Sequence, residues 1–269
     1  MAGLRRSWGG RIWAVSHIGG LRKLHLRQNQ LTSLPSTIGD LSQLEILDLL
    51  GNELAGPIPS TLGQLSQLVF LHLGLNRFTS VPPEIGDLDA AVEVYLDGNL
   101  LTSLPQEIGD LAAVEILWIG QNEITGPFPM QLLNLSTLHQ LVLDDNHFSG
   151  PLPVELATVG GPDFSFLSLG DNDFSGTIPP ELAQLDAGIS LVNNDLVGEV
   201  PLEFASGPPN MRLRIHWNCV TATEPALVGK LNLWNPGWQS TQCTKVFDDD
   251  FATGDLSRWS SFEGTLADP

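Results

Sequence analysis

Among the residues whose types could perform covalent or metal chemistry, the two cysteines are the first to consider. Cys219 and Cys243 are separated by 23 residues and are the only two cysteines in the chain. Neither a pair of histidines nor a second pair of cysteines accompanies them, so they do not make a zinc site. The residues leave two alternatives, a disulfide or two inert thiols. A disulfide would imply an oxidising compartment.

The remaining candidates for chemistry form no catalytic or metal-binding pattern. The sequence contains no GxSxG, HExxH, P-loop or GxGxxG motif. His25 and His72 occupy equivalent positions of a repeated unit, one per unit, and do not cluster. Asp248, Asp249 and Asp250 lack the spacing of an EF-hand loop, and we interpret them as part of a solvated acidic linker. We therefore expect no enzyme, no metal and no cofactor.

A repeated unit of 22 to 26 residues occupies most of the chain. Apolar residues stand eight, five and three positions before an asparagine and two positions after it, so the unit reads LxxLxLxxNxL. The asparagines of successive units are Asn29, Asn52, Asn76, Asn99, Asn122, Asn146, Asn172, Asn194 and Asn218.

This unit resembles that of the leucine-rich-repeat family, and the resemblance covers about residues 18–220. The second half of the unit comes in two forms, TSLPxxIGxL, as at 31–41, and a plant-type LxGxIP form, as at 55–65. The resemblance implies an α/β solenoid, a curved array with a parallel β-sheet on its concave face and loops or 3-10 turns on its convex face. We expect about eight to nine repeats over 18–217, preceded by an N-terminal segment or partial repeat at 1–17.

The pattern also has a physical reading that does not depend on the family. Alternating apolar residues make a short strand whose inward side chains pack on the next coil, and successive strands form one parallel sheet. Each asparagine can satisfy backbone groups where the chain leaves the strand, so stacked asparagines form a ladder. Burying each leucine contributes about 1.5 to 3 kcal/mol, but no coil buries its own face, so stability must come from stacking.

Two units depart from the pattern. The unit that ends at Asn172 contains two extra residues around 160–162, which we interpret as a small bulge on the convex side. The unit that ends at Asn194 is short, and Asp186 occupies its first apolar position. We expect local distortion there.

The segment 218–243 keeps one ladder asparagine and then leaves the repeat. We expect Thr223 to be the N-cap of a helix that has Pro225 in its first turn. The segment resembles the Cys-bounded C-terminal caps of exported bacterial repeat proteins. That resemblance implies a disulfide between Cys219 and Cys243, which would stabilise the fold by about 2 to 4 kcal/mol.

The candidate binding residues follow from the strand alternation. Residues six, four and two positions before each asparagine alternate with buried ones and should face solvent on the concave side. At the fourth position, successive coils present His72, Tyr95 and Trp118, a contiguous row because adjacent strands lie about 4.8 Å apart. Exposed rings with a charged rim are typical of partner-binding surfaces, although the rings could also only cover the sheet. The candidate ligand-binding residues are Phe70, His72, Glu93, Tyr95, Asp97, Ile116, Trp118 and Asp144.

The distribution of charge limits the class of partner. The formal net charge is −19, and between positions 28 and 211 Arg77 is the only Lys or Arg among 24 acidic residues. Such a surface repels phosphate backbones, so we expect no nucleic acid, and it should attract cationic partners. The alternative is that the acidic residues only keep a repeat protein soluble.

These observations predict a non-catalytic scaffold that recognises a protein or peptide, in particular a cationic one, through its concave face. Carbohydrate binding is one alternative, because rings beside carboxylates also suit sugars, and a structural or adhesin spacer is another. No apolar run reaches the 18 residues of a membrane span.

The ends of the sequence bear on where the protein acts. The first residues are basic but have no apolar core of a signal peptide. Residues 244–269 are similar to a DxFxxGDLSxW motif of secreted bacterial proteins, and we expect an acidic linker and the start of a truncated following domain. The expectation is a fragment of a longer secreted or cell-surface protein.

Overall fold

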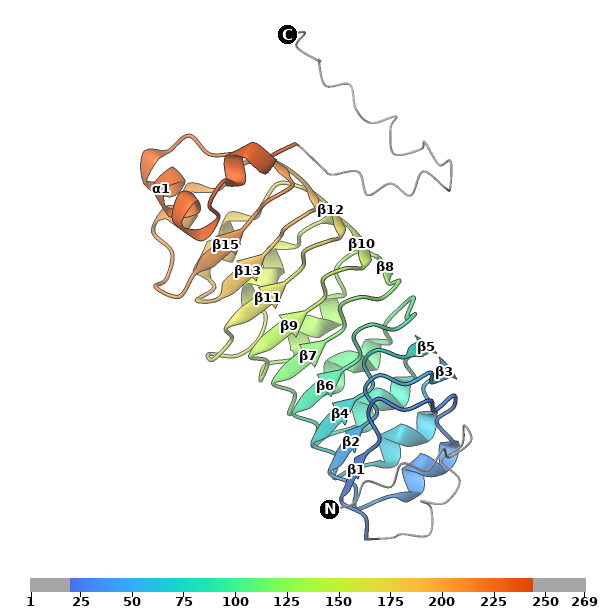
Figure 1. Cartoon of the computed structure of the whole chain (residues 1–269). Helices are drawn as coiled ribbons and strands as arrows, with labels where there is room; N and C mark the ends of the chain where they lie inside the picture. Colours follow the sequence, from blue (N-terminus) through green and yellow to red (C-terminus); the bar gives the residue numbers. More distant parts are fainter. Residues whose placement is uncertain (1–19, 244–269) are drawn as a thin grey trace, which may run out of the picture.

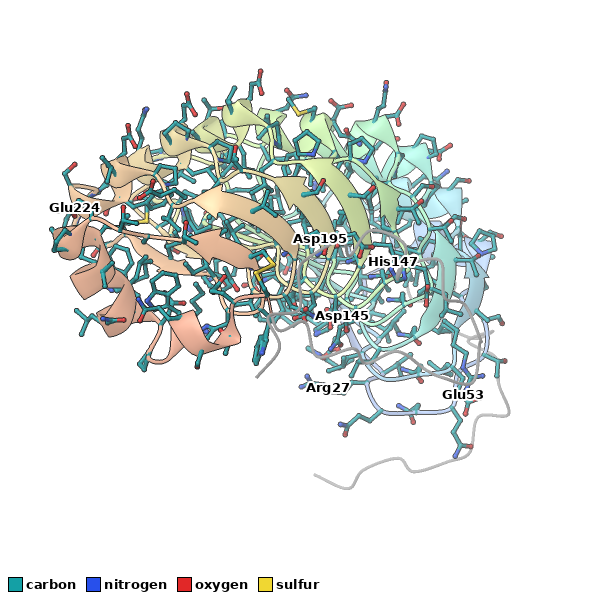
Figure 2. The ribbon with its side chains drawn as sticks, turned by 90° about the horizontal axis from the view of Figure 1, so that it is seen from above. Arg27, Glu53, Asp145, His147, Asp195 and Glu224 are labelled. Atoms are coloured by element: carbon teal, nitrogen blue, oxygen red, sulfur yellow. A yellow bond between two sulfur atoms is a disulfide. The ribbon has the colours of Figure 1, made fainter. Side chains whose placement is uncertain are left out.

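The repeats stack into one curved array in the computed structural model, which describes residues 20–243 (Figure 1). Strand β1 (Lys23–His25) lies at one end of the array and helix α1 (Pro225–Trp234) at the other. Seen from above, the array bends into an arc (Figure 2). The N-terminal segment expected at 1–17 and the acidic linker expected at 244–269 lie outside the described residues.

Parallel strands that follow one another in chain order form a nine-stranded sheet on the concave face. The central residue of each strand, such as Leu71 or Leu117, is buried in the core, as the LxL alternation predicts. The strands are β1, β2 (Ile46–Asp48), β4 (Phe70–His72), β6 (Glu93–Tyr95), β7 (Ile116–Trp118), β9 (Gln140–Val142), β11 (Phe166–Ser168), β13 (Gly188–Ser190) and β15 (Arg212–Arg214).

A short 3-10 helix covers the convex side of each coil. Every one of these helices begins directly after a proline with extended backbone, such as Pro59. The glycine of the IGxL pattern allows neighbouring helices to pack closely, since a Cβ at Gly39 would lie 2.3 Å from the carbonyl oxygen of Thr61. The helices are η1 (Ser36–Asp40), η2 (Ser60–Gln64), η3 (Pro83–Asp87), η4 (Gln106–Asp110), η5 (Met130–Asn134), η6 (Val154–Thr158), η7 (Pro180–Gln184) and η8 (Leu202–Ala205).

Between the concave sheet and the convex helices, each coil has a third side, and some coils form an additional short strand there. The LxGxIP units form a strand there, in which the glycine takes a positive φ, +82° at Gly150, and the proline that follows keeps the backbone extended. Residues 77–80 also form a strand on this side, although their unit lacks that glycine. The TSLP coil at 100–105 forms no strand and separates two side sheets, and a cavity of about 350 Å³ opens beside this break. One sheet contains β3 (Ala55–Pro57) and β5 (Arg77–Ser80), and the other β8 (Thr125–Gly126), β10 (His147–Pro151), β12 (Asp173–Gly176), β14 (Asp195–Glu199) and β16 (Cys219–Thr221).

Buried asparagine side chains join each coil to the preceding one. The Oδ1 atom of Asn99 accepts a hydrogen bond from the backbone N–H of Phe78 at 3.0 Å. Its Nδ2 donates to the carbonyls of Leu73 at 3.1 Å and Leu96 at 3.0 Å. One carboxamide thus pairs backbone groups of two coils that would otherwise be buried without partners. The same arrangement recurs at Asn52, Asn76, Asn122, Asn146, Asn172, Asn194 and Asn218.

The ladder changes at its two ends. Asn29 is exposed, and its Nδ2 donates to the carbonyls of Leu26 at 2.9 Å and Arg27 at 3.1 Å within its own coil. At the other end Asn235 is fully buried; its Oδ1 accepts from the N–H of Ile215 at 3.1 Å, and its Nδ2 donates to the carbonyl of Leu213. The cap therefore adds a further rung that the repeat pattern did not predict.

The two irregular units leave the concave sheet intact. The extra residues at 160–162 lie between η6 and β11, off the concave strands. The carboxylate of Asp186 accepts hydrogen bonds from the backbone of Asn210 at 2.8 Å and from its side chain at 3.0 Å. Strand β13 pairs in register with both neighbours, so the distortion expected beside Asp186 does not reach the strand.

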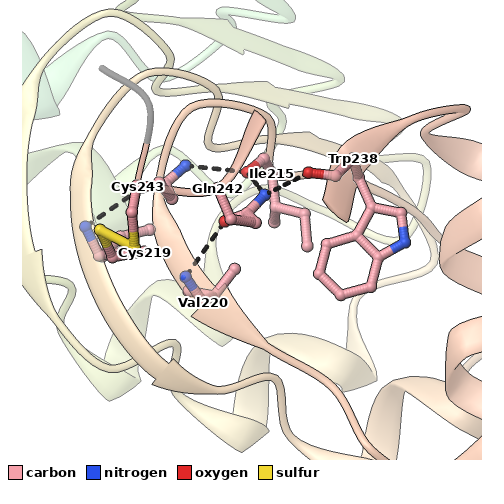
Figure 3. The surroundings of a disulfide bond; sticks show 8 residues. Ile215, Cys219, Val220, Trp238, Gln242 and Cys243 are labelled. Carbon is pink, nitrogen blue, oxygen red and sulfur yellow. Dashed lines mark hydrogen bonds between the residues drawn. A yellow bond between two sulfur atoms is a disulfide. The ribbon is translucent and has the colours of Figure 1, made fainter. Parts of the chain in front are cut away.

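Helix α1 and η9 (Trp238–Thr241) close the C-terminal end of the array (Figure 1). Figure 3 shows the surroundings of the disulfide at this end. Cys219 and Cys243 form a disulfide there. The side chain of Gln242 accepts from the N–H of Val220 at 3.1 Å and donates to the carbonyl of Ile215 at 3.0 Å. The disulfide and this side chain together fasten residues 242 and 243 to the last coil.

The expected N-cap of α1 is wrong by one residue. Glu224 is the cap, because its Oε2 accepts from the N–H of Leu227 at 2.7 Å. The hydroxyl of Thr223 instead donates to the carboxylate of Glu199 in the preceding coil. Threonine is the better intrinsic cap, but a carboxylate at a helix N-terminus also gains from the helix dipole. Pro225 occupies the first turn, as predicted.

Replacing Asn99 with alanine should reduce the free energy of unfolding by about 1 to 3 kcal/mol, because buried backbone groups of two coils lose their partner. The matched control is Gln121→Ala, at an exposed position on the next coil, which should change the free energy by less than about 0.5 kcal/mol. Urea unfolding followed by circular dichroism measures both. Equal losses would contradict the role of the ladder.

Candidate functional site

Four neighbouring strands of the concave sheet, β4, β6, β7 and β9, position the predicted ligand-binding residues. The strand register aligns His72 with Tyr95 and Tyr95 with Trp118. Asp97 and Asp144 lie two residues beyond the ends of β6 and β9, where the alternation directs their side chains to the same face. None of these residues is fully buried. A second row lies two residues earlier on the same strands, where Phe70 aligns with Glu93 and Glu93 with Ile116.

Four rings meet on this face and form what we call the aromatic cluster: Phe70, His72, Tyr95 and Trp118. His72 stacks on Tyr95 with 4.7 Å between ring centroids, and Tyr95 meets Trp118 edge to face at 5.3 Å. Phe70 lies 5.7 Å from Tyr95. Trp118 remains 37% exposed. These rings form a continuous apolar surface, and aromatic pairs in such geometries stabilise each other.

Tyr95 is held in the centre of the aromatic cluster by a neighbour on its own strand. Its hydroxyl donates a hydrogen bond to Oε2 of Glu93 at 2.8 Å. Burial raises the pKa of Tyr95 far above its ordinary value, and the Glu93 carboxylate raises the pKa further. The phenol therefore stays protonated and keeps its ring in place.

Two carboxylates border the aromatic cluster and are only partly hydrated. Burial raises the pKa of both Asp97 and Asp144 above the ordinary aspartate value. The Oδ1 atom of Asp97 is buried and has no hydrogen-bond partner among the described residues. Burial also lowers the pKa of His72, although the charge of Asp97 opposes that shift. A neutral imidazole at pH 7 leaves Asp97 without a full positive charge beside it.

Glycines alternate with these carboxylates along the sheet. The residues two positions before successive asparagines are Gly74, Asp97, Gly120, Asp144 and Gly170. A Cβ at Gly74 would lie 2.8 Å from Oδ1 of Asp97, and one at Gly120 would lie 3.3 Å from Oδ1 of Asp144. Each carboxylate thus leans toward the glycine of the preceding coil. The absence of a side chain at Gly74 and at Gly120 gives these carboxylates room to pack against the sheet.

Charges at the two ends of the concave sheet differ from those in the middle. At the N-terminal end Asp48 is 4% exposed and lies 3.4 Å from both His25 Nδ1 and Arg27 Nε. The alternation placed Asp48 outward, but these two long side chains cover it. At the C-terminal end Arg212 and Arg214 are exposed. Strand alternation predicts the direction of a side chain but not whether neighbouring side chains cover it. The contacts of Asp48 with His25 and Arg27 were therefore not predicted from the sequence.

Within residues 20–243, no three or more His, Cys, Asp or Glu side chains group in a way that could hold a metal ion. In the same part of the chain, no helix has the length and apolarity needed to cross a membrane. What the concave face offers to a partner is aromatic surface and two partly desolvated carboxylates. These groups bind by packing and by charge.

Comparison with protein families matches two parts of the array. A leucine-rich repeat region matches residues 9–94, and a single Leucine Rich Repeat matches residues 164–185. A search against curated proteins found no significant match.

Solved structures with the same fold include receptor ectodomains and a bacterial protein. The LRR ectodomain of the Arabidopsis thaliana receptor kinase GASSHO1/SCHENGEN3 is 29% identical with a TM-score of 0.66, over 77% of this chain and 28% of that one. The ectodomain of the Arabidopsis receptor kinase HAESA is 26% identical with a TM-score of 0.64, over 80% and 41%. A Leptospira interrogans LRR protein is 26% identical with a TM-score of 0.53, over 82% and 72%. This chain spans less than half the length of either receptor ectodomain.

The sequence repeat, the architecture and the comparisons agree. Parallel strands line the concave face, buried asparagines join the coils and 3-10 helices cover the convex face. Both family matches overlap these coils, and the solved structures are leucine-rich-repeat proteins. The chain is a leucine-rich-repeat solenoid with a disulfide-bounded C-terminal cap.

Proposed function

We propose that this chain is a non-catalytic binding scaffold that recognises a protein or peptide segment on its concave face. The observation that carries the proposal is the aromatic cluster, in which Trp118 packs against Tyr95 and still stays 37% exposed. Binding energy at protein interfaces concentrates in a few aromatic residues surrounded by polar ones. Glu93, Asp97 and Asp144 supply that polar rim.

The related ectodomains support a peptide as the partner. The GASSHO1/SCHENGEN3 ectodomain was solved in complex with CASPARIAN STRIP INTEGRITY FACTOR 2, and that of HAESA with an N-terminally extended IDA peptide hormone ligand. Those ligands belong to those receptors. They support the general role of a recognition surface here, because the fold is shared and the concave face of this chain carries exposed rings.

Carbohydrate is the second candidate ligand, since sugar sites also combine aromatic rings with carboxylates. Two contacts favour a peptide instead. Tyr95 and Trp118 meet edge to face with an interplanar angle of 79°, so their faces do not form one flat platform for a sugar ring. The carboxylate of Glu93 is already bonded to the hydroxyl of Tyr95.

We also propose that the protein acts outside the cytoplasm, as a secreted or cell-surface protein. The disulfide between Cys219 and Cys243 supports this location, because such bonds persist in oxidising compartments.

Truncating Trp118 to alanine should weaken peptide binding by about 2 kcal/mol or more and leave the melting temperature within about 2 °C, because the ring points away from the core. Suitable probes are peptides selected from a displayed library of random dodecapeptides, with affinities measured by calorimetry. The matched control is Trp217→Ala, because Trp217 is 38% exposed but lies outside the aromatic cluster.

Three results would contradict the proposal. The selection could yield no peptide that binds. The two tryptophan variants could lose affinity equally, which would place the site elsewhere. A glycan array that binds the native chain but not the Trp118 variant would favour carbohydrate.

The charged carboxylate of Asp97 lowers the free energy of unfolding at neutral pH. Its pKa is raised in the folded state, so folding favours the protonated form. The stability linked to that proton is present below the unfolded-state pKa and is lost as the pH rises through the folded-state pKa. At neutral pH the charged group therefore opposes folding, which is expected of a residue kept for binding.

Asp97→Asn should accordingly raise the melting temperature at pH 7, by about 2 °C for a group that is still partly hydrated. The gain should shrink as the pH falls through the raised folded-state pKa, where the native aspartate also becomes neutral, and should be gone below the unfolded-state pKa of about 4. Thermal unfolding from pH 3 to pH 8 measures the difference. Asp89→Asn, in an exposed turn, removes the same charge and should show no such gain. A lower melting temperature for Asp97→Asn at pH 7 would show that the carboxylate supports the fold.

A further inference from the structure

His72 is the ring of the aromatic cluster that can gain a positive charge as the pH falls below neutral. It stacks on Tyr95 with 4.7 Å between ring centroids, so Tyr95 has His72 on one side and Trp118 on the other. The Nδ1 atom of His72 accepts a hydrogen bond from the backbone N–H of Gly74 at 3.2 Å. An accepting ring nitrogen carries no proton, so the proton of the neutral imidazole lies on Nε2. The stacked ring is therefore the neutral ring in one tautomer.

A second proton on His72 is incompatible with this position. The imidazolium carries a hydrogen on each ring nitrogen, so the N–H of Gly74 would face another N–H instead of an acceptor. Burial also opposes the charge and lowers the pKa of His72 below its ordinary value. Protonation at lower pH therefore breaks the contact with Gly74 and displaces the ring from its place beside Tyr95.

On the side of β2, the charged groups near His72 are paired with one another. Asp48 is the residue of β2 that aligns with His72. Its Oδ2 lies 3.4 Å from Nδ1 of His25 and 3.4 Å from Nε of Arg27. The charges of Asp48 and Arg27 shift the pKa of His72 in opposite directions. The carboxylate on this side of the ring is thus already occupied.

On the other side, β6 and the turn after it carry two carboxylates whose surroundings differ. Oε2 of Glu93 accepts the hydrogen bond of the Tyr95 hydroxyl at 2.8 Å. Oδ1 of Asp97 is buried and has no hydrogen-bond partner among the described residues. A Cβ placed on Gly74 would lie 2.8 Å from this oxygen and 2.9 Å from Cε1 of His72, so the carboxylate and the imidazole border the same small space. Among the charges that favour a proton on His72, that of Asp97 has the largest effect.

From these contacts we propose that the aromatic cluster is a pH-dependent binding surface, in which protonated His72 leaves Tyr95 and pairs with the buried carboxylate oxygen of Asp97. The inference rests on the proposed function and deepens it, because it names the condition under which the peptide is held or released. With a neutral His72, the peptide packs on a surface of uncharged rings. With a charged His72, Tyr95 has lost one neighbour, and an apolar residue of the peptide would have to desolvate a cation. Affinity therefore falls as the medium becomes acidic.

Nuclear magnetic resonance of the isotopically labelled whole chain tests the switch without a ligand, and His72→Phe identifies the signal of His72. Long-range proton–nitrogen spectra should show the Nε2–H tautomer at pH 8 and a protonation midpoint below 6.5, the ordinary value of histidine. The ring protons of Tyr95 should shift with the same midpoint, because they lose the stacked imidazole. Asp97→Asn should lower the midpoint by about half a pH unit or more, because the carboxylate that favours the charged ring is gone.

The binding probe is a selected dodecapeptide with blocked ends and without aspartate, glutamate, histidine or cysteine, so its own charge stays constant between pH 8 and pH 5. The native chain should bind it about threefold to tenfold more weakly at pH 5 than at pH 8. His72→Phe keeps a ring beside Tyr95 and should change by less than about twofold. The matched control is His147→Phe, which removes an exposed imidazole from side strand β10 (Figure 2) and should retain the full loss. Melting temperatures at both pH values confirm that each variant is folded.

The outcomes separate this inference from the proposed function. A loss of affinity at pH 5 that His72→Phe retains would assign the pH dependence to other groups and overturn the switch. Affinity that does not change with pH, Tyr95 signals that do not follow the protonation of His72, or a midpoint that Asp97→Asn leaves unchanged would also overturn it and leave peptide recognition standing. If no selected peptide binds at pH 8, the proposed function is contradicted, and the spectra alone still decide whether His72 changes its partner.

Discussion

The carboxamide of one asparagine per coil is the interaction on which the rest of the structure depends. A coil of this length has no second layer of its own, so backbone groups at the turn after each strand would be buried without partners. Asn99 and its equivalents pair those groups with the preceding coil. Because the bonds run between coils, they fix the spacing and the register of all the strands. Burial of the leucine rows then stabilises an array whose geometry is already determined.

That register is also what creates the candidate site. Rings that are far apart in sequence, such as His72, Tyr95 and Trp118, become neighbours only because each coil repeats the same path. Backbone hydrogen bonds between the coils likewise align Gly120 with Asp97 on one side and Asp144 on the other. In a solenoid of this kind the inward residues stabilise the fold, so the outward residues can vary without loss of the core. Burial raises the pKa of Asp97 and of Asp144, so each charged carboxylate opposes folding at this place on the concave face.

Periodicity was sufficient to predict the fold, the concave strands and the direction of each side chain. Spacing alone could not predict contacts between coils that depend on individual side chains. Thr223 was the expected helix cap, but its hydroxyl donates a hydrogen bond to Glu199 of the preceding coil, and Glu224 is the cap. Asn235 acts as a ladder residue although its segment has no repeat pattern. The burial of Asp48 under Arg27 and the unpaired Oδ1 of Asp97 likewise depend on rotamers and neighbours.

We propose that the aromatic cluster on β4, β6 and β7, whose most exposed ring is Trp118, is the surface to which a peptide binds. A crystal structure of the whole chain with a selected dodecapeptide tests it most directly. The account predicts a peptide lying across these strands with an apolar residue against Trp118, and the side sheets left free. A peptide seated instead in the cavity beside Met130, or along the convex helices, would contradict the account.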